Sequence, residues 1–141
     1  MQSFIKKYSL YGAWGVALLA TFGSLFFSEV LHFQPCVLCW YQRIFIYPLV
    51  VILAIAIMKK DTLVHQYALP LVYIGTVISI FQNLLYYKVI PEALAPCTAG
   101  VSCTTQYIHW LGFISIPLLS LISFISIGLL LIVYKKQHEI K

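Results

Sequence analysis

The stretch PCVLCWYQR, residues 35–43, places two cysteines three positions apart at the point where a long apolar run begins. Pro35 favours a helix start, because the N–H that proline lacks would have no partner in the first helical turn. Cys36 and Cys39 are close enough in sequence to form a reversible disulfide. A helix N-terminus and the cation of Arg43 would lower the pKa of their thiols. The stretch therefore predicts a redox-active dithiol in the first turn of a helix.

The composition around this stretch is that of an integral membrane protein. Of the 141 residues, 62% are hydrophobic and only 9% are charged, and the mean hydropathy is +0.93. A soluble domain carries about 25% charged residues, so this chain has too few charges to cover its apolar surface in water. A transmembrane β-barrel would show alternating segments of about ten residues, whereas the apolar runs here are continuous and about twice as long.

The apolar sequence divides into four runs, each long enough to cross about 30 Å of hydrocarbon at about 1.5 Å of helix rise per residue. We therefore predict an all-α polytopic membrane protein, in which residues 1–141 form one four-transmembrane-helix bundle. Small residues in the first run, among them Ala13, Gly15 and Ala17, would let a neighbouring helix approach closely. The predicted spans are residues 10–28, 40–58, 68–87 and 111–134.

Lysine residues gather in the N-terminal segment, in the loop between the second and third spans, and in the C-terminal segment. With four spans these segments share one side of the membrane, and the positive-inside rule makes that side, with both termini, cytoplasmic. The connectors at residues 29–39 and 88–110, which hold all four cysteines, are then extracytoplasmic, where disulfides form and persist. These lysines account for the net charge of +5, so we expect no nucleic-acid partner. They are Lys6, Lys7, Lys59, Lys60, Lys135, Lys136 and Lys141.

Two dithiols on one side of a membrane, Cys36 with Cys39 and Cys97 with Cys103, can pass a disulfide between them by thiolate attack. We expect electrons to enter at the loop pair, which a soluble partner can reach. They would leave through the pair at the helix end to a quinone dissolved in the bilayer. Two alternatives, inert structural disulfides and a zinc site made by all four cysteines, would make the protein a four-helix membrane scaffold. A C-x-x-C disulfide closes too small a loop to stabilise much through chain entropy, which favours exchange chemistry.

Arg43 follows Cys39 by four residues and therefore shares its helix face. An arginine at the edge of a span often does no more than extend its cation to the lipid headgroups. The functional interpretation is that Arg43 favours the Cys39 thiolate and hydrogen-bonds a quinone oxygen. We expect its neighbours Trp40, Tyr41 and Gln42 to pack at the membrane interface.

With these residues in place, the chain resembles the membrane thiol oxidases called disulfide-bond formation protein B, and its compact second loop is similar to that of the Bacillus-type short versions. The resemblance covers nearly the whole chain: four spans, residues 35–43 at the start of the second, and a cysteine pair before the fourth. It implies a protein of the cell membrane that reoxidises an extracytoplasmic thioredoxin-fold thiol oxidase. The electrons would pass to menaquinone or ubiquinone, which supports disulfide bond formation in secreted proteins.

The resemblance also implies a role for each site residue. Cys97 would form the mixed disulfide with the partner, and Cys103 would exchange with Cys36. Cys39 would hand electrons to the quinone, beside Arg43. The short spacing between Cys97 and Cys103 departs from the longer loop of the best-studied members. The vitamin K epoxide reductase family also has four cysteines in a helical bundle, but there the loop pair precedes the C-x-x-C, the reverse of the order here.

Overall fold

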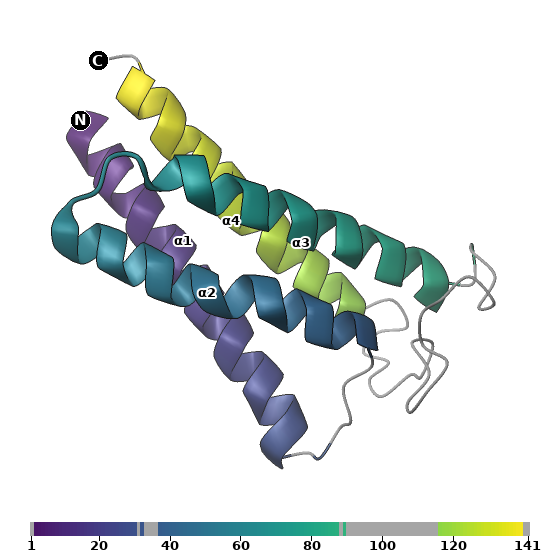
Figure 1. Cartoon of the computed structure of the whole chain (residues 1–141). Helices are drawn as coiled ribbons and strands as arrows, with labels where there is room; N and C mark the ends of the chain where they lie inside the picture. Colours follow the sequence, from purple (N-terminus) through teal and green to yellow (C-terminus); the bar gives the residue numbers. More distant parts are fainter. Residues whose placement is uncertain (1, 31, 33–36, 88, 90–115, 140–141) are drawn as a thin grey trace.

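The computed structural model describes residues 2–30, 32, 37–87, 89 and 116–139. Within these residues the chain forms four long helices, and no strand occurs, so the predicted all-α fold is confirmed. A short π-helical segment, η1 (Phe26–Val30), continues the first helix. The long helices are α1 (Gln2–Leu25), α2 (Val37–Lys59), α3 (Val64–Tyr86) and α4 (Ile116–Glu139) (Figure 1).

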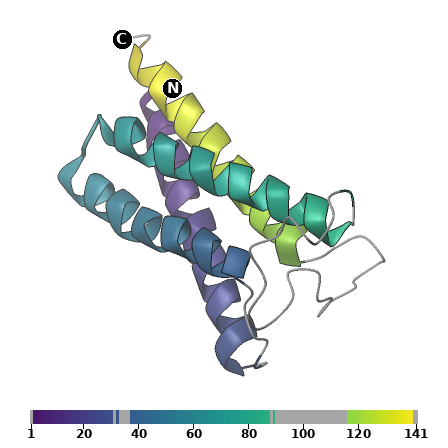
Figure 2. The same ribbon diagram turned by 45° about the vertical axis from the view of Figure 1, so that its right-hand side comes forward.

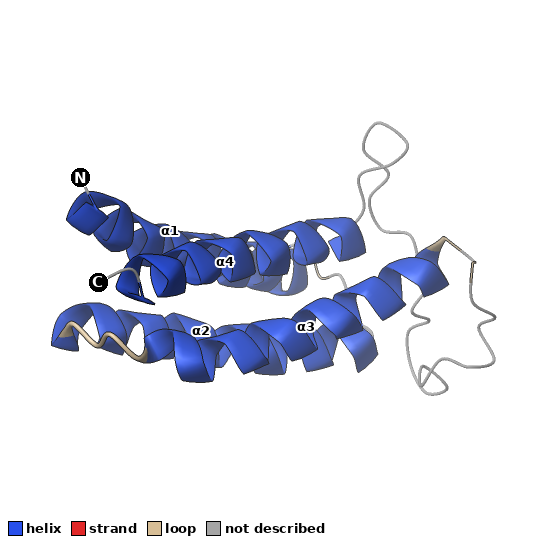
Figure 3. Ribbon diagram, turned by 90° about the horizontal axis from the view of Figure 1, so that it is seen from above, coloured by secondary structure: helices blue, strands red, loops and turns tan. Residues whose placement is uncertain are grey.

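The four helices form a ring in which each packs against two others. α1 and α3 both contact α2 and α4, and α1 with α4 forms one layer over α2 with α3 (Figure 3). Consecutive helices run in opposite directions, so both chain ends and the α2–α3 turn lie at one end of the bundle (Figures 1 and 2). We call this the lysine end, and the opposite end, where α2 begins, the cysteine end. The lysine end carries Lys6, Lys7, Lys59, Lys60, Lys135 and Lys136.

All four helices have the length and the apolar character of membrane spans. Mean hydropathy ranges from 1.6 to 2.3, and the shortest candidate span, Trp40–Lys59, has 20 residues. A helix of this length reaches across about 30 Å of hydrocarbon. Large apolar side chains such as Leu19, Val51, Tyr73 and Leu129 are exposed on the outside of the helices, as a lipid environment requires. The chain is therefore a multi-pass membrane protein.

The helices extend beyond the predicted spans at the lysine end. α1 begins at Gln2 and not near residue 10, α3 begins at Val64 and not near residue 68, and α4 continues to Glu139. Apolar run length marks the part of a helix that lies in the hydrocarbon, whereas polar helix formers such as lysine and glutamine continue a helix beyond it. Residues 111–115 of the predicted fourth span, residues 31 and 33–36 of the first predicted redox loop, and residues 88 and 90–110 of the second lie outside the described residues.

Hydrogen bonds fix the α2–α3 turn at the lysine end. Lys60 has a φ of 54°, and the N–H of Asp61 donates to the carbonyl of Ala56 at 2.9 Å, a common way to end a helix. The Tyr67 hydroxyl donates to the Asp61 carboxylate, and so does the N–H of Leu63 at 2.8 Å. Both bonds, that of Tyr67 first, favour the ionised carboxylate and lower the pKa of Asp61. The turn thus holds the start of α3 close to the end of α2.

Small residues let the helices approach at the centre of the bundle. Ala13 and Ala17 of α1 are fully buried, as the sequence predicts, whereas a Cβ added at Gly15 would meet nothing within 4 Å. Gly75 of α3 lies against the ring of Phe124 on α4, and a Cβ added at Gly75 would lie 2.6 Å from the Cζ of that ring. The ring of Phe124 is completely buried, so it has little room to move.

We predict that Gly75→Ala lowers the free energy of unfolding by about 1–3 kcal/mol, because the added methyl group forces Phe124 out of its packed position. Unfolding by sodium dodecyl sulfate in mixed micelles measures the change. Gly15→Ala is the matched control and should be neutral or slightly stabilising, since its methyl group meets open space. Adding Phe124→Leu to Gly75→Ala should restore part of the loss. Equal stability of the Gly75→Ala and Gly15→Ala proteins would contradict this packing.

Candidate functional site

Cys39 lies in the first turn of α2, because the helix begins at Val37. At a helix N-terminus the aligned peptide dipoles favour a thiolate over a thiol. Cys36, Cys97 and Cys103 lie outside the described residues, so disulfide exchange between the two cysteine pairs stays a prediction.

Arg43, one turn after Cys39, connects α2 to the end of α1. Its Nε donates to the Ser24 hydroxyl at 2.8 Å. Its Nη2 donates to the Ser24 carbonyl at 3.0 Å and also to the hydroxyl of Ser28, which lies in η1. The guanidinium carbon lies 5.3 Å from the centroid of the Trp40 ring, within the range of a cation–π contact. The cation is therefore held in one orientation by the neighbouring helix.

The remaining guanidinium nitrogen of Arg43, Nη1, has no hydrogen-bond acceptor among the residues that the structure describes. No carboxylate of the described residues forms an ion pair with the guanidinium. Guanidinium keeps its charge in proteins and carries five N–H donors in one plane. Arg43 can thus offer a positive charge and the two N–H groups of Nη1 to an acceptor near the first turns of α2.

A polar cluster, buried except for the partly exposed Ser120, lies in the interior of the bundle at the cysteine end, next to Arg43 along α2. Its hydroxyls and amides form a chain of hydrogen bonds. Ser79 donates to Ser120 at 3.4 Å, Ser120 donates to Oε1 of Gln42 at 2.6 Å, and Nε2 of Gln42 donates to Oε1 of Gln82. In a bilayer no water replaces a lost partner, so these bonds tie α2, α3 and α4 together. We define the polar cluster as Gln42, Ser79, Gln82, Asn83 and Ser120.

Asn83 extends the polar cluster to the start of α4. Its Nδ2 donates to the Ser79 carbonyl at 2.8 Å and to the Pro117 carbonyl at 2.9 Å. Pro117 is the second residue of α4, so this bond positions the first turn of that helix against α3. The Oδ1 atom of Asn83 is buried and has no hydrogen-bond partner among the described residues.

The expectation that Gln42 packs at the membrane interface is wrong. Its side chain is only 6% exposed and bonds to two other helices, while Trp40 and Tyr41 on the same turn are exposed. The sequence does contain a signal for the polar cluster. Ser79, Gln82 and Asn83 are polar residues three and four positions apart within an apolar run, and such residues usually face other helices.

A metal site is the other chemistry that the cysteines could support. Within the part of the chain that the structure describes, no group of three His, Cys, Asp or Glu side chains could hold a metal ion. Three of the four cysteines lie outside that part, so the zinc alternative stays open.

Comparison with known proteins gives a consistent set of relatives. The family model described as "Disulfide bond formation protein DsbB" matches residues 6–134. The "Disulfide bond formation protein C" of Bacillus subtilis (strain 168) is 51% identical over 130 residues, which cover 92% of this chain and 94% of the relative. The "Probable disulfide formation protein C 1" of Bacillus anthracis is 48% identical over 123 residues, which cover 87% and 88%. No solved structure matches the chain.

We predict that the double substitution Ser24→Ala, Ser28→Ala lowers the free energy of unfolding by about 1 kcal/mol, because it removes two of the three hydrogen bonds that Arg43 donates to α1 and η1. Unfolding in mixed micelles measures the loss. Ser123→Ala is the matched control, since that hydroxyl bonds only to the Leu119 carbonyl of its own helix at 2.9 Å. If the double variant is as stable as Ser123→Ala, α1 does not hold Arg43.

Proposed function

Because the chain belongs to the disulfide bond formation protein DsbB family, we propose that it reoxidises an extracytoplasmic thioredoxin-fold thiol oxidase and passes the electrons to a membrane quinone. Family membership makes it a membrane oxidoreductase of disulfide bond formation; the partner and the quinone are what we add. One observation carries this addition. α1 holds the Arg43 guanidinium one turn from Cys39, and the Nη1 donors have no acceptor among the described residues.

In the proposed exchange, a disulfide moves outward from the cysteine end to the partner. A thiolate of the reduced partner attacks Cys97 of the Cys97–Cys103 disulfide, and Cys103 leaves as a thiolate. The second partner thiolate then displaces Cys97, so the partner leaves oxidised. The Cys97–Cys103 disulfide is restored when Cys103 attacks Cys36 of the Cys36–Cys39 disulfide and Cys97 then displaces Cys36. The two electrons from the partner now reside on the reduced pair Cys36 and Cys39.

Arg43 would act at the last step, in which the thiols of Cys36 and Cys39 become a disulfide. When bound, a quinone supplies the acceptor for the two electrons and two protons that this oxidation releases. The guanidinium would stabilise the Cys39 thiolate and donate hydrogen bonds from Nη1 to a quinone oxygen. Trp40 and Tyr41, exposed on the same turn of α2, would offer aromatic surface to the ring. Menaquinone and ubiquinone both fit this description.

The charge distribution supports an orientation with the lysine end in the cytoplasm and the cysteine end outside. Six described lysines lie at the first end, whereas Arg43 is the cation among the described residues at the second. By the positive-inside rule, the lysine end would face the cytoplasm. The dithiols would then face the oxidising side of the cell membrane, where a secreted thiol oxidase is available.

We predict that Cys39→Ser abolishes electron transfer to quinone, because the step that oxidises Cys36 and Cys39 loses one of its two sulfur atoms. The assay is anaerobic: purified protein, a reduced thioredoxin-fold dithiol and a soluble quinone, with quinone loss followed by absorbance. The serine variant should retain the unfolding free energy of the wild type, within about 0.5 kcal/mol for a near-isosteric change.

Full activity in the Cys39→Ser protein would refute the mechanism. An inactive wild-type protein that contains one zinc ion per chain by elemental analysis would instead support the scaffold with a four-cysteine zinc site.

A further inference from the structure

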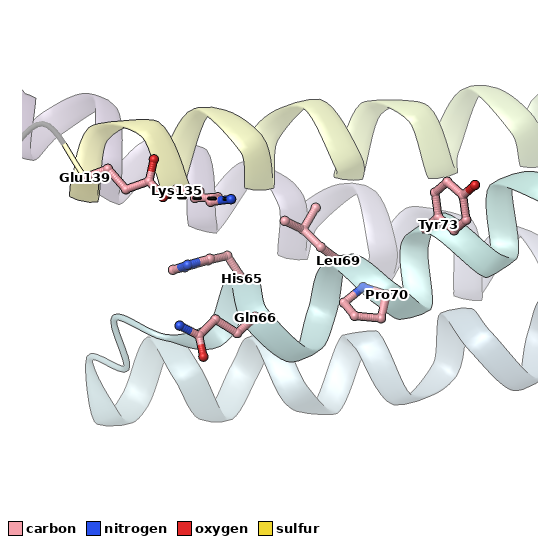
Figure 4. A pocket seen from close by; sticks show the side chains of 7 residues that line it. All are labelled: His65, Gln66, Leu69, Pro70, Tyr73, Lys135 and Glu139. Carbon is pink, nitrogen blue, oxygen red and sulfur yellow. Dashed lines mark ion pairs between the residues drawn. The ribbon is translucent and has the colours of Figure 1, made fainter.

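A groove of about 560 Å³ opens at the lysine end between the start of α3 and the end of α4. His65 and Gln66 line it from α3, and Lys135 and Glu139 line it from α4 (Figure 4). The groove lies at the opposite end of the bundle from Cys39, so the proposed redox chemistry makes no use of it. Its size is within the range of small-molecule binding sites.

The first turn of α3, which carries His65 and Gln66 of the groove lining, has backbone N–H groups without a described acceptor. The helix has no side-chain cap, and its N-cap position is Leu63. The N–H of Gln66 donates to the Leu63 carbonyl at 2.9 Å, but the N–H groups of Val64 and His65 have no acceptor among the described residues. Free N–H groups and the positive end of the helix dipole favour an anion at this position.

His65 is a second and independent indication of a ligand. Its side chain is only 7% exposed, and its Nδ1 is buried with no hydrogen-bond partner among the described residues. The ring lies between the first turn of α3 and α4, on the wall of the groove (Figure 4). Its neighbours are the rings of Tyr134 and His138, with centroids 6.4 and 6.3 Å away. A buried polar group without a partner is costly, and a bound polar ligand would reduce that cost.

The charge around the groove favours a negative ligand. Lys135 lines it and forms an ion pair with Glu139 at 3.8 Å, and the two side chains are 45% and 65% exposed, so water screens this pair. Lys6 of α1 lies close by, with its Nζ 5.5 Å from the centroid of the Tyr134 ring. Glu139 is the acidic residue of the lining and opposes an anion, but the described residues at this end of the bundle include six lysines, so the end as a whole is positively charged.

The side of the groove farther along α3 is apolar and leads toward the lipid-facing surface. Leu69, Pro70 and Tyr73 form this part of the lining, and Tyr73 is 72% exposed. Pro70 has no N–H to donate to the carbonyl of Gln66 four residues earlier, so this carbonyl can accept a hydrogen bond from a hydroxyl group. The groove therefore combines donors and cations at the end of the helices with an apolar path into the bilayer. An amphiphile matches both halves.

We propose that this groove binds the phosphodiester headgroup of an anionic phospholipid. The phosphate lies at the start of α3 near Lys135, and the acyl chains follow Leu69 and Tyr73 into the bilayer. Basic pockets between transmembrane helices commonly bind anionic headgroups in this way. A zwitterionic headgroup, such as that of phosphatidylcholine, has no net negative charge and gains little from the lysines. The site is independent of the cysteines and of the proposed oxidase activity.

The test uses the full chain, purified in detergent and freed of lipid, and measures its affinity for phosphatidylglycerol by native mass spectrometry. Lys135→Gln should weaken binding about fivefold, the effect of one lysine near a bound anionic headgroup. Lys136→Gln is the matched control, because Lys136 is adjacent in sequence but does not line the groove; it should weaken binding by less than about twofold. Glu139→Gln should strengthen binding, since it removes the opposing charge.

Opposite effects of Lys135→Gln and Glu139→Gln separate a ligand site from a structural ion pair, which both substitutions would break alike. The proposal is overturned if both variants weaken binding, if Lys136→Gln acts as strongly as Lys135→Gln, or if phosphatidylcholine binds as tightly as phosphatidylglycerol. Inorganic phosphate that competes with the lipid at equal affinity would assign the groove to a free anion and would also overturn it.

Discussion

Two adjacent residues of α2 tie the cysteine end of this bundle together. Gln42 bonds to Gln82 of α3 and accepts a hydrogen bond from Ser120 of α4, while Arg43 donates to Ser24 of α1 and Ser28 of η1. One turn of one helix thereby contacts all three of the other helices. The constraint behind this arrangement is general: within a bilayer an amide or a guanidinium must find its partners in the protein. Because Cys39 lies one turn before both residues, the same contacts fix the backbone that carries it.

The two ends of the bundle differ in how their polar groups find partners. At the cysteine end, polar side chains hydrogen-bond to one another within the bundle, and the Nη1 donors of Arg43 have no described acceptor, which supports the proposed docking of an electron acceptor near Cys39. At the lysine end, charges and helix termini face outward, and the groove beside His65 is lined by both polar and apolar groups. The centre is apolar and closely packed, with Phe124, Leu49 and Leu53 fully buried. The proposed redox site and the proposed lipid site lie at opposite ends of the bundle, so substitutions at one should leave the other unchanged.

Apolar run length and lysine placement predict the membrane class and the four helices, because the cost of placing charge or an open backbone in lipid leaves few alternatives. Helix ends are less predictable, because hydropathy does not report where backbone hydrogen bonding begins or stops. α1, for example, starts at Gln2, well before the apolar run. The position of Arg43 next to Cys39 follows from helical spacing, but its hydrogen bonds to Ser24 and Ser28 do not, because the sequence does not state how α1 rotates about its axis. The hydrogen-bond partners of Gln42 cannot be predicted from the sequence for the same reason. They lie 40 and 78 positions away in the sequence, and a single polar residue at a span edge is equally compatible with the interface.

The most direct test of this account is a double-mutant cycle on the contact between α2 and α4. Gln42→Leu, Ser120→Ala and the double variant would be compared with the wild type by their free energies of unfolding in mixed micelles. We expect a coupling energy of about 0.5–1.7 kcal/mol between the two side chains. The double variant should lose less unfolding free energy than the sum of the two single losses, because either substitution alone already removes the 2.6 Å hydrogen bond from Ser120 to Gln42. Losses that add to within about 0.3 kcal/mol would show that the two side chains do not interact, and would contradict the claim that Gln42 holds the cysteine end of the bundle together.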